Sequence, residues 1–118
     1  MKEYMMIFLG ADYANANLSQ EQIQERMGKW FAWGDKMGKA GILVGGEALA
    51  AGGKRISGKA GKDRVITDTP AIESKELIGG YYTVKAESFD DVVKITEDYP
   101  DFDLGGTVEI REVINFDQ

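Results

Sequence analysis

The chain has 118 residues, the usual size of a single domain and enough to bury a hydrophobic core without disulfides. Its formal net charge of −6 opposes a general affinity for phosphate backbones, because nucleic-acid binding depends on clustered Lys and Arg. The absence of Cys and His excludes disulfides and thiolate chemistry, and it removes the commonest metal ligand and general base. We therefore expect one domain over residues 1–118, without a metal, an organic cofactor or a nucleic-acid partner.

The N-terminal segment contains a short apolar run, Tyr4–Leu9, that ends at Gly10. It is far shorter than the roughly 20 residues that a membrane span needs, and no small-residue cleavage site follows it. We expect a cytoplasmic protein with no membrane partner. The run is apolar at nearly every position, which predicts a central strand that is buried on both faces.

A long helix is predicted from Ser19 to Gly41. Ser19 and Gln22 form a capping-box pattern, and Leu18 and Ile23 are spaced as a hydrophobic staple. The glycines inside the helix disfavour it, so we expect close packing of the helix against a sheet to offset them. The residues expected on its inner face, at helical spacing, are Ile23, Met27, Trp30, Gly34 and Met37.

The middle of the chain predicts a strand and a hairpin. Residues 42–49 form an apolar strand, and Gly45-Gly46 suggests a bulge or a close approach of another backbone. A glycine-rich, basic stretch over residues 52–62 predicts an exposed hairpin tip, with short strands around 55–56 and 64–67. Asp68-Thr69-Pro70 is typical of a turn.

The last third predicts strand, helix and strand. Residues 81–86 alternate between a polar and an apolar face. Ser88 caps a second helix that Pro100 should end, and residues 107–114 form a final alternating strand. We expect the inner face of the second helix to consist of Phe89, Val92, Val93, Thr96 and Tyr99.

The predicted order is β-α-β, hairpin, β-α-β. Two βαβ halves in this length predict an α+β, ferredoxin-like split-βαβ fold, in which two helices cover one face of a four-stranded antiparallel sheet. Met5, Ile7 and Leu9 alternate with Met6 and Phe8, so both faces of the first strand are apolar. Because the helices cover only one face, we expect a homodimer in which a second copy covers the other.

Two segments carry a family resemblance. Residues 41–49 read GILVGGEAL, and residues 65–82 read VITDTPAIESKELIGGYY. They resemble the YCII-related, DGPF-type family, whose members show "aGxLvgGExL" followed by "vtDGPFaEsKEvigGYy". Residues 29–33 and 105–111 also resemble the family, so the similarity covers nearly the whole chain. The resemblance implies a dimeric α+β barrel with a small-molecule or regulatory role, and it implies no particular reaction.

The chain departs from the family in two respects. Thr69, Ala71 and Ile72 occupy the positions where the naming motif has Gly, Phe and a small residue, respectively, which changes the local turn and any pocket that the Phe would line. Broader relatives have a His and an Asp that are proposed as a catalytic pair. The chain contains no His and cannot inherit that mechanism.

Charged residues provide the first candidates for a ligand site. Asp68, Glu73 and Lys75 fall within one loop and could form a charged rim of a pocket, or they could cap a turn and form ordinary ion pairs. Glu47 lies within an otherwise apolar strand, and a carboxylate there requires either solvent or a partner. We expect Glu47 and the 68–75 loop to meet on one side of the subunit.

Aromatic residues complete the candidate site. Trp30 and Trp33 could line a flat apolar cleft, or they could simply pack in the core or at a dimer contact. Tyr81 and Tyr82 point to opposite faces of one strand, so only one can reach a given cavity. The predicted ligand-binding residues are Glu47, Asp68, Glu73, Lys75, Tyr81, Trp30 and Trp33.

Two functions follow from these features. One is a small-molecule site, enzymatic or not, in a cleft between the Glu47 strand and the Asp68–Lys75 loop. The other is a regulatory or accessory protein that acts through its dimer surface without catalysis. A closed pocket of roughly 300 Å³ or more favours the first function, whereas a filled interior with an exposed apolar patch favours the second.

Overall fold

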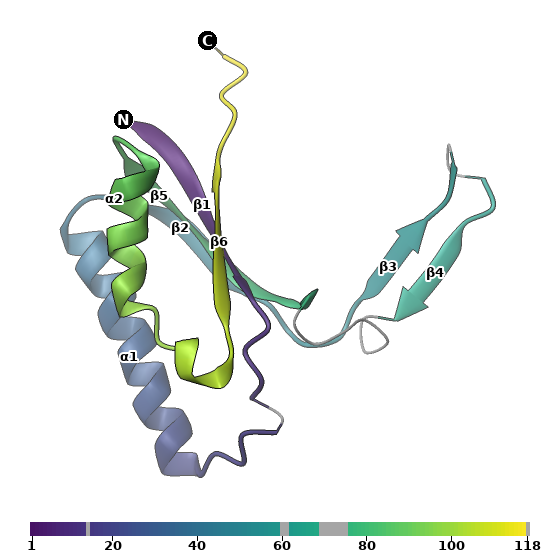
Figure 1. Ribbon diagram of the computed structural model, residues 1–118, viewed down its shortest axis with the longest axis horizontal. Coiled ribbons are helices and arrows are strands. Elements are labelled where there is room, and N and C mark those ends of the chain that lie inside the picture. Colours follow the sequence, from purple (N-terminus) through teal and green to yellow (C-terminus); the bar gives the residue numbers. More distant parts are fainter. Residues whose placement is uncertain (14, 60–61, 69–75, 118) are drawn as a thin grey trace.

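The computed structural model describes residues 1–13, 15–59, 62–68 and 76–117. The order of elements confirms the predicted β-α-β, hairpin, β-α-β arrangement (Figure 1). Short 3-10 turns at Thr96–Asp98 and Phe102–Leu104 link the last helix to the last strand. The elements are β1 (Lys2–Leu9), α1 (Gln20–Lys39), β2 (Leu43–Ala48), β3 (Lys54–Ser57), β4 (Val65–Asp68), β5 (Ile78–Ala86), α2 (Phe89–Ile95) and β6 (Thr107–Glu112).

The main sheet is antiparallel, with four strands in the order β2-β5-β1-β6. The first strand is therefore central, as its apolar run predicts. The strands β3 and β4 pair only with each other and form a separate two-stranded sheet. This arrangement confirms the α+β, ferredoxin-like fold.

Helix α1 begins as its sequence predicts. Ser19 accepts a hydrogen bond from the backbone N–H of Gln22, and the Gln22 side chain accepts one from the Ser19 N–H, which completes the capping box. The expected inner face is partly wrong. Ile23 and Met27 are 43% and 48% exposed, because the helix contacts the sheet through Trp33 and Met37.

The interior glycines of α1 are expected to allow close packing against the sheet, and only one of them does. A Cβ atom at Gly28 or Gly38 would meet no atom within 4 Å, so close packing against the sheet explains neither residue. At Gly34 a Cβ would lie 3.4 Å from the Tyr82 hydroxyl, which is the one approach of the expected kind. The glycine-sheet contact is thus confined to one helical turn.

Helix α2 is shorter than predicted. It ends at Ile95 and continues as a 3-10 turn, so the regular helix stops before Pro100. Phe89 and Val93, expected on the inner face, are about half exposed, whereas Val92 and Tyr99 are buried. A helix of two turns presents only a narrow stripe to the sheet, which explains why fewer side chains are covered.

The core lies between the two helices and one face of the sheet. Phe8 lies at its centre, with ring-centroid distances of 5.1 to 5.7 Å to four other aromatic side chains. These are Trp30, Trp33, Tyr82 and Tyr99. Edge-to-face and stacked rings at these separations add to the stabilisation from burial alone. The aromatic cluster fixes how α1 and α2 lie on the sheet.

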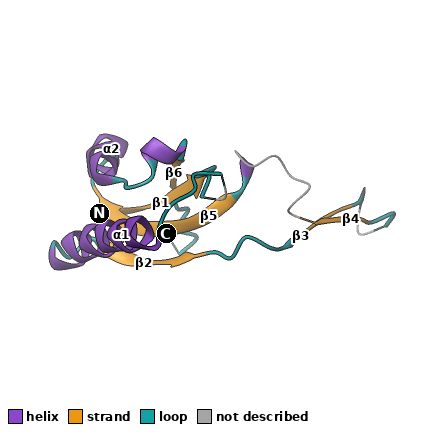
Figure 2. Ribbon diagram, turned by 90° about the horizontal axis from the view of Figure 1, so that it is seen from below, coloured by secondary structure: helices purple, strands orange, loops and turns teal. Residues whose placement is uncertain are grey.

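Both helices lie on the same side of the sheet, and the β3–β4 hairpin projects on the other side (Figures 1 and 2). The radius of gyration is 16.3 Å. A compact chain of this length would have about 13.5 Å. The projecting hairpin explains why the radius of gyration exceeds that of a compact chain. Because the hairpin extends away from the sheet, no described element covers the second sheet face.

Candidate functional site

The uncovered sheet face carries two of the predicted ligand-binding residues. Glu47 of β2 and Tyr81 of β5 lie directly opposite each other in the strand register. Tyr82, the next residue along β5, packs against Phe8 on the helix side, so Tyr81 points to the uncovered face. Glu47 is exposed and Tyr81 is half-buried. The two side chains therefore lie side by side on the uncovered face.

An apolar strip runs along the centre of this face. Met5, Ile7 and Leu9 are half-buried, while their neighbours in β1 are buried against the helices. Ile7 lies between Tyr81 of β5 and Glu109 of β6 in the register. We define the open face as this strip with Glu47, Tyr81, Thr83, Glu109 and Arg111. An apolar centre with a charged rim is the usual composition of a binding surface.

The two tryptophans lie on the opposite side of the sheet. Trp33 is 3% exposed and donates a hydrogen bond from Nε1 to the Ile95 carbonyl at 3.1 Å. Trp30 is half-buried, and its ring and that of Phe8 form an edge-to-face pair. The sheet thus separates the tryptophans from Glu47 and Tyr81, and these four residues do not line one cleft within a subunit.

The predicted loop is described only at its start. Asp68 ends β4 and forms an ion pair with Lys54 across the hairpin, where both side chains are exposed. Glu73 and Lys75 lie outside the described residues, as do Thr69, Ala71 and Ile72. The predicted meeting of Glu47 with the 68–75 loop therefore stays a prediction.

A second cluster was not predicted from sequence. Asp101 is 3% exposed and is the one buried charged residue in the part of the chain that the structure describes. Its carboxylate accepts hydrogen bonds from Tyr13 Oη at 2.6 Å, Trp30 Nε1 at 3.3 Å and Arg26 Nη1 at 3.2 Å. Arg26 also binds the Asp103 carboxylate, at 2.5 Å. Three donors, one of which is the Arg26 cation, compensate for the burial of this carboxylate.

The cluster changes the acidity of its members. Burial of the phenol, followed by its hydrogen bond to Asp101, raises the pKa of Tyr13 to about 12. The hydrogen bond from Arg26 lowers the pKa of Asp103. Burial also raises the pKa of Tyr99, which lies beside the cluster. The phenols are therefore neutral near pH 7, and Tyr13 acts there as a hydrogen-bond donor to Asp101.

Sequence reasoning missed Asp101 because its partners are distant along the chain. Tyr13, Trp30 and Arg26 precede it by 88, 71 and 75 residues. The Tyr99-Pro100-Asp101 segment is read as the end of a helix, and no local pattern indicates a buried carboxylate. A weak signal was available, because Arg26, Lys29 and Lys36 recur on one side of α1 and match the acidic 98–103 segment.

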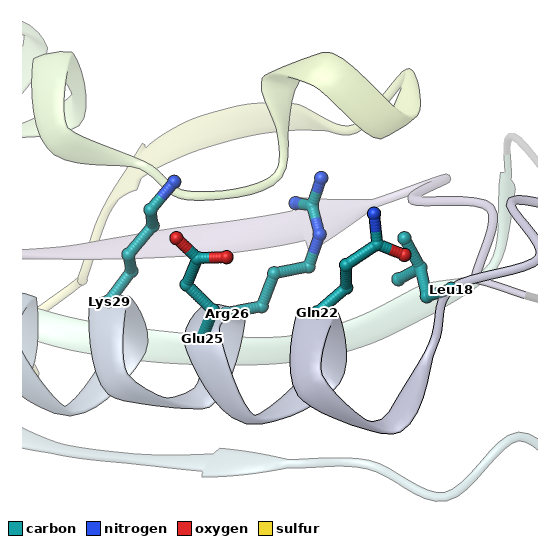
Figure 3. Close-up of a pocket in the computed structure, with 5 residues that line it drawn as sticks. All are labelled: Leu18, Gln22, Glu25, Arg26 and Lys29. Carbon is teal, nitrogen blue, oxygen red and sulfur yellow. The ribbon is translucent and has the colours of Figure 1, made fainter.

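Two shallow depressions lie on α1. One has a volume of about 130 Å³, and the side chains that line it are drawn in Figure 3, where Arg26 and Lys29 rise from the helix in the same direction. The other has about 250 Å³ and includes Trp33, Lys36 and Asp98. Both are smaller than the roughly 300 to 1,000 Å³ of typical small-molecule pockets. Neither includes Glu47 or Tyr81.

Over the described ranges, no three acidic side chains come together in a way that could hold a metal ion. Within those same ranges, no helix has the length and hydropathy to cross a bilayer. The chemistry available is that of carboxylates, phenols, an indole and basic side chains.

The YCII-related domain model matches residues 5–117 of the chain. The chain belongs to the YCII-related family. The match includes both the Asp101 cluster and the open face, and it agrees with the resemblance of residues 41–49 and 65–82. No curated protein matched the sequence significantly.

Proposed function

We propose that this YCII-related protein is a homodimer that binds a small organic molecule in a cleft at the open face, where Glu47 and Tyr81 contact the ligand. The observation that carries the proposal is the pairing of these two residues in the register of β2 and β5. They lie on a sheet face that no described element covers, next to the apolar strip of β1.

The homodimer is supported by the composition of the open face. Met5, Ile7 and Leu9 form an apolar strip across the central strand of the sheet. Apolar strips of this kind are stable in water when another protein surface covers them. A second copy presents the same strip, so a two-fold interface would cover both at once.

The ligand class is supported by the chemistry of the pair. An ionised Glu47 carboxylate accepts hydrogen bonds and attracts cationic groups, and the Tyr81 ring offers a flat apolar surface. Partial cover by a second subunit would lower the local dielectric and strengthen both contacts. The fitting ligand is a small molecule with an amine or another donor group on an aromatic or aliphatic body. The Asp68–Lys75 loop would complete the rim of this cleft.

Thermal-shift screening against amine-containing and aromatic metabolites tests the proposal, because a ligand that binds only the folded state raises its stability. Glu47→Gln removes the charge with little change in shape. We expect it to unfold at the wild-type temperature without ligand and to lose the ligand-dependent rise. Glu109→Gln is the matched control on the same face and should retain the rise. Hits that stabilise Glu47→Gln as strongly as wild type would contradict the proposal.

Two observations favour the second candidate, an interaction protein without a ligand. Neither depression on α1 reaches the roughly 300 Å³ of a small-molecule pocket. Ile23, Met27 and Phe31 follow each other at four-residue spacing on α1 and are 43% to 70% exposed. An apolar helical stripe of this kind can dock on another protein. The screen separates the two functions, because a dimer that no compound stabilises would favour the interaction protein.

A further inference from the structure

The β3–β4 arm, defined as residues 54–59 and 62–68, extends away from the rest of the molecule (Figures 1 and 2). Each of its strands has four residues, and both pair only with each other. An isolated two-stranded hairpin is only marginally stable in water, and such hairpins are usually stabilised by packing against another element. Packing against another protein surface would therefore stabilise the arm.

The arm also exposes apolar side chains. Ile56 and Ile66 lie opposite each other in the register, so they share one face of the hairpin. They are 56% and 55% exposed. Lys54 and Asp68 lie on the same face and pair near the base of the arm. This face has the apolar centre and charged end of a contact surface, and no described element of the same chain covers it.

The charge of the arm is opposite to that of the remaining chain. Residues 54–68 contain five basic and two acidic side chains, a net charge of +3. The other residues contain nine basic and 18 acidic side chains, a net charge of −9. The body of a second copy is therefore electrostatically complementary to the arm.

We propose that the arm of one copy docks on the body of the second copy, beside the interface formed by the two open faces. The inference rests on the homodimer proposed above and adds a second contact to it. The arm projects on the side of the sheet opposite the helices, the side on which a second copy would lie (Figures 1 and 2). Reciprocal docking of two arms would then follow from the two-fold symmetry.

A nucleic acid is the other occupant that a basic arm could attract. It would leave the Ile56–Ile66 face uncovered, because phosphates are bound by cations and not by aliphatic side chains. The acidic body would also repel a nucleic acid close to the arm. A second copy satisfies both the apolar face and the charge, and it is the occupant that the observations favour.

Cross-linking between isotopically distinct copies tests the docking. The chain has no cysteine, so Ser57→Cys on β3 gives one attachment point for a photoactivatable cross-linker. Labelled protein is mixed with an excess of 15N-enriched wild type, and cross-linked peptides are identified by mass spectrometry. We expect peptides that join the arm of one isotopic form to the body of the other. A dimer whose cross-links lie within single copies would overturn the inference while leaving the homodimer intact.

Charge reversal provides the energetic test. Arg55→Glu with Arg64→Glu should raise the dimer dissociation constant at least about tenfold, because both the attraction and the steering between arm and body are lost. Lys36→Glu with Lys39→Glu on α1 is the control with the same change of net charge and should have a smaller effect. If the two double variants raise the dimer dissociation constant equally, the inference is overturned. If wild type is a monomer, both the inference and the proposed function are overturned. A third outcome is that wild type binds duplex DNA, while the Arg55→Glu, Arg64→Glu variant does not bind DNA and dimerises as tightly as wild type. That result would overturn the inference and would show that the arm binds nucleic acid.

Discussion

The Tyr13 hydroxyl donates a hydrogen bond of 2.6 Å to the buried Asp101 carboxylate, across 88 residues of sequence. The bond joins the segment after β1 to the segment after α2. The Asp12 N–H also donates to the Leu104 carbonyl at 3.1 Å, so side-chain and backbone bonds join the same two segments. Arg26 and Trp30 add α1 to this junction. Asp101 thus links three elements at one end of the fold.

The first prediction concerns the charge of Asp101. Asp101→Asn should lower the free energy of unfolding by about 2–4 kcal/mol, because it removes the buried charge that pairs with the half-buried Arg26 and gives Tyr13 a weaker acceptor. Urea unfolding measures the loss. Asp103→Asn is the control, since that carboxylate is exposed and solvent screens its pair with Arg26, so the loss should be much smaller. Similar losses in the two variants would contradict a structural role for the buried carboxylate.

The second prediction concerns alkaline pH. The pKa of Tyr13 is raised from 10.0 to about 12 in the folded protein, so the folded state holds the proton more tightly. The protonated Tyr13 phenol stabilises the folded state fully at pH values below the pKa of Tyr13 in the unfolded chain. This stabilisation is lost as pH rises through the pKa of Tyr13 in the folded protein. Tyr13→Phe should therefore reduce the fall in urea midpoint between about pH 9 and about pH 12. Tyr82 and Tyr99 also have raised pKa values, so part of the fall should remain. An unchanged fall in the variant would contradict the assignment to Tyr13.

The third prediction compares two glycines. A Cβ at Gly46 would collide with the Tyr81 carbonyl oxygen and the Tyr82 ring, so Gly46→Ala should destabilise the fold by about 1–3 kcal/mol. A Cβ at Gly28 would meet nothing within 4 Å, so Gly28→Ala should stabilise α1 by about 0.5–1 kcal/mol. Thermal unfolding should show a lower midpoint than wild type for Gly46→Ala and a higher midpoint for Gly28→Ala. A loss of stability in Gly28→Ala would show that α1 packs more closely than described.

The fourth prediction tests the aromatic cluster. Phe8→Ala should cost about 3–5 kcal/mol, because the buried ring contacts four other aromatic side chains and its removal leaves a cavity. Phe31→Ala removes the same side chain from a position that is 70% exposed, and in a monomeric sample it should change stability by less than about 1 kcal/mol. Chemical denaturation of the two variants should therefore give very different midpoints. Comparable midpoints would contradict the packing of the cluster.

Most of the fold could be predicted from the sequence because its signals are local. The capping box at Ser19 and Gln22, the apolar run of β1 and the basic hairpin each depend on neighbouring residues, and each is found where expected. Gly46 also has the close backbone approach that its place in a strand suggests. The order of elements then restricts the topology to few possibilities.

The features that could not be predicted from the sequence depend on tertiary packing. Ile23 and Met27 have helical spacing but lie outside the stripe that contacts the sheet, and no local pattern sets the rotation of a helix about its axis. Glu47 and Tyr81 could be placed on strands, but their pairing required the register between β2 and β5. Asp101 required three distant donors. The candidate site was therefore less predictable than the fold.

The most direct test of the homodimer is its mass in solution, measured by light scattering at micromolar concentration. We expect a particle of twice the 13.0 kDa chain mass for wild type, and a folded monomer for Ile7→Lys, which places a charge on the open face. Phe31→Lys, which changes the exposed side of α1, should remain a dimer. A monodisperse wild-type monomer, or an Ile7→Lys variant that remains dimeric, would contradict a homodimer formed through the open face.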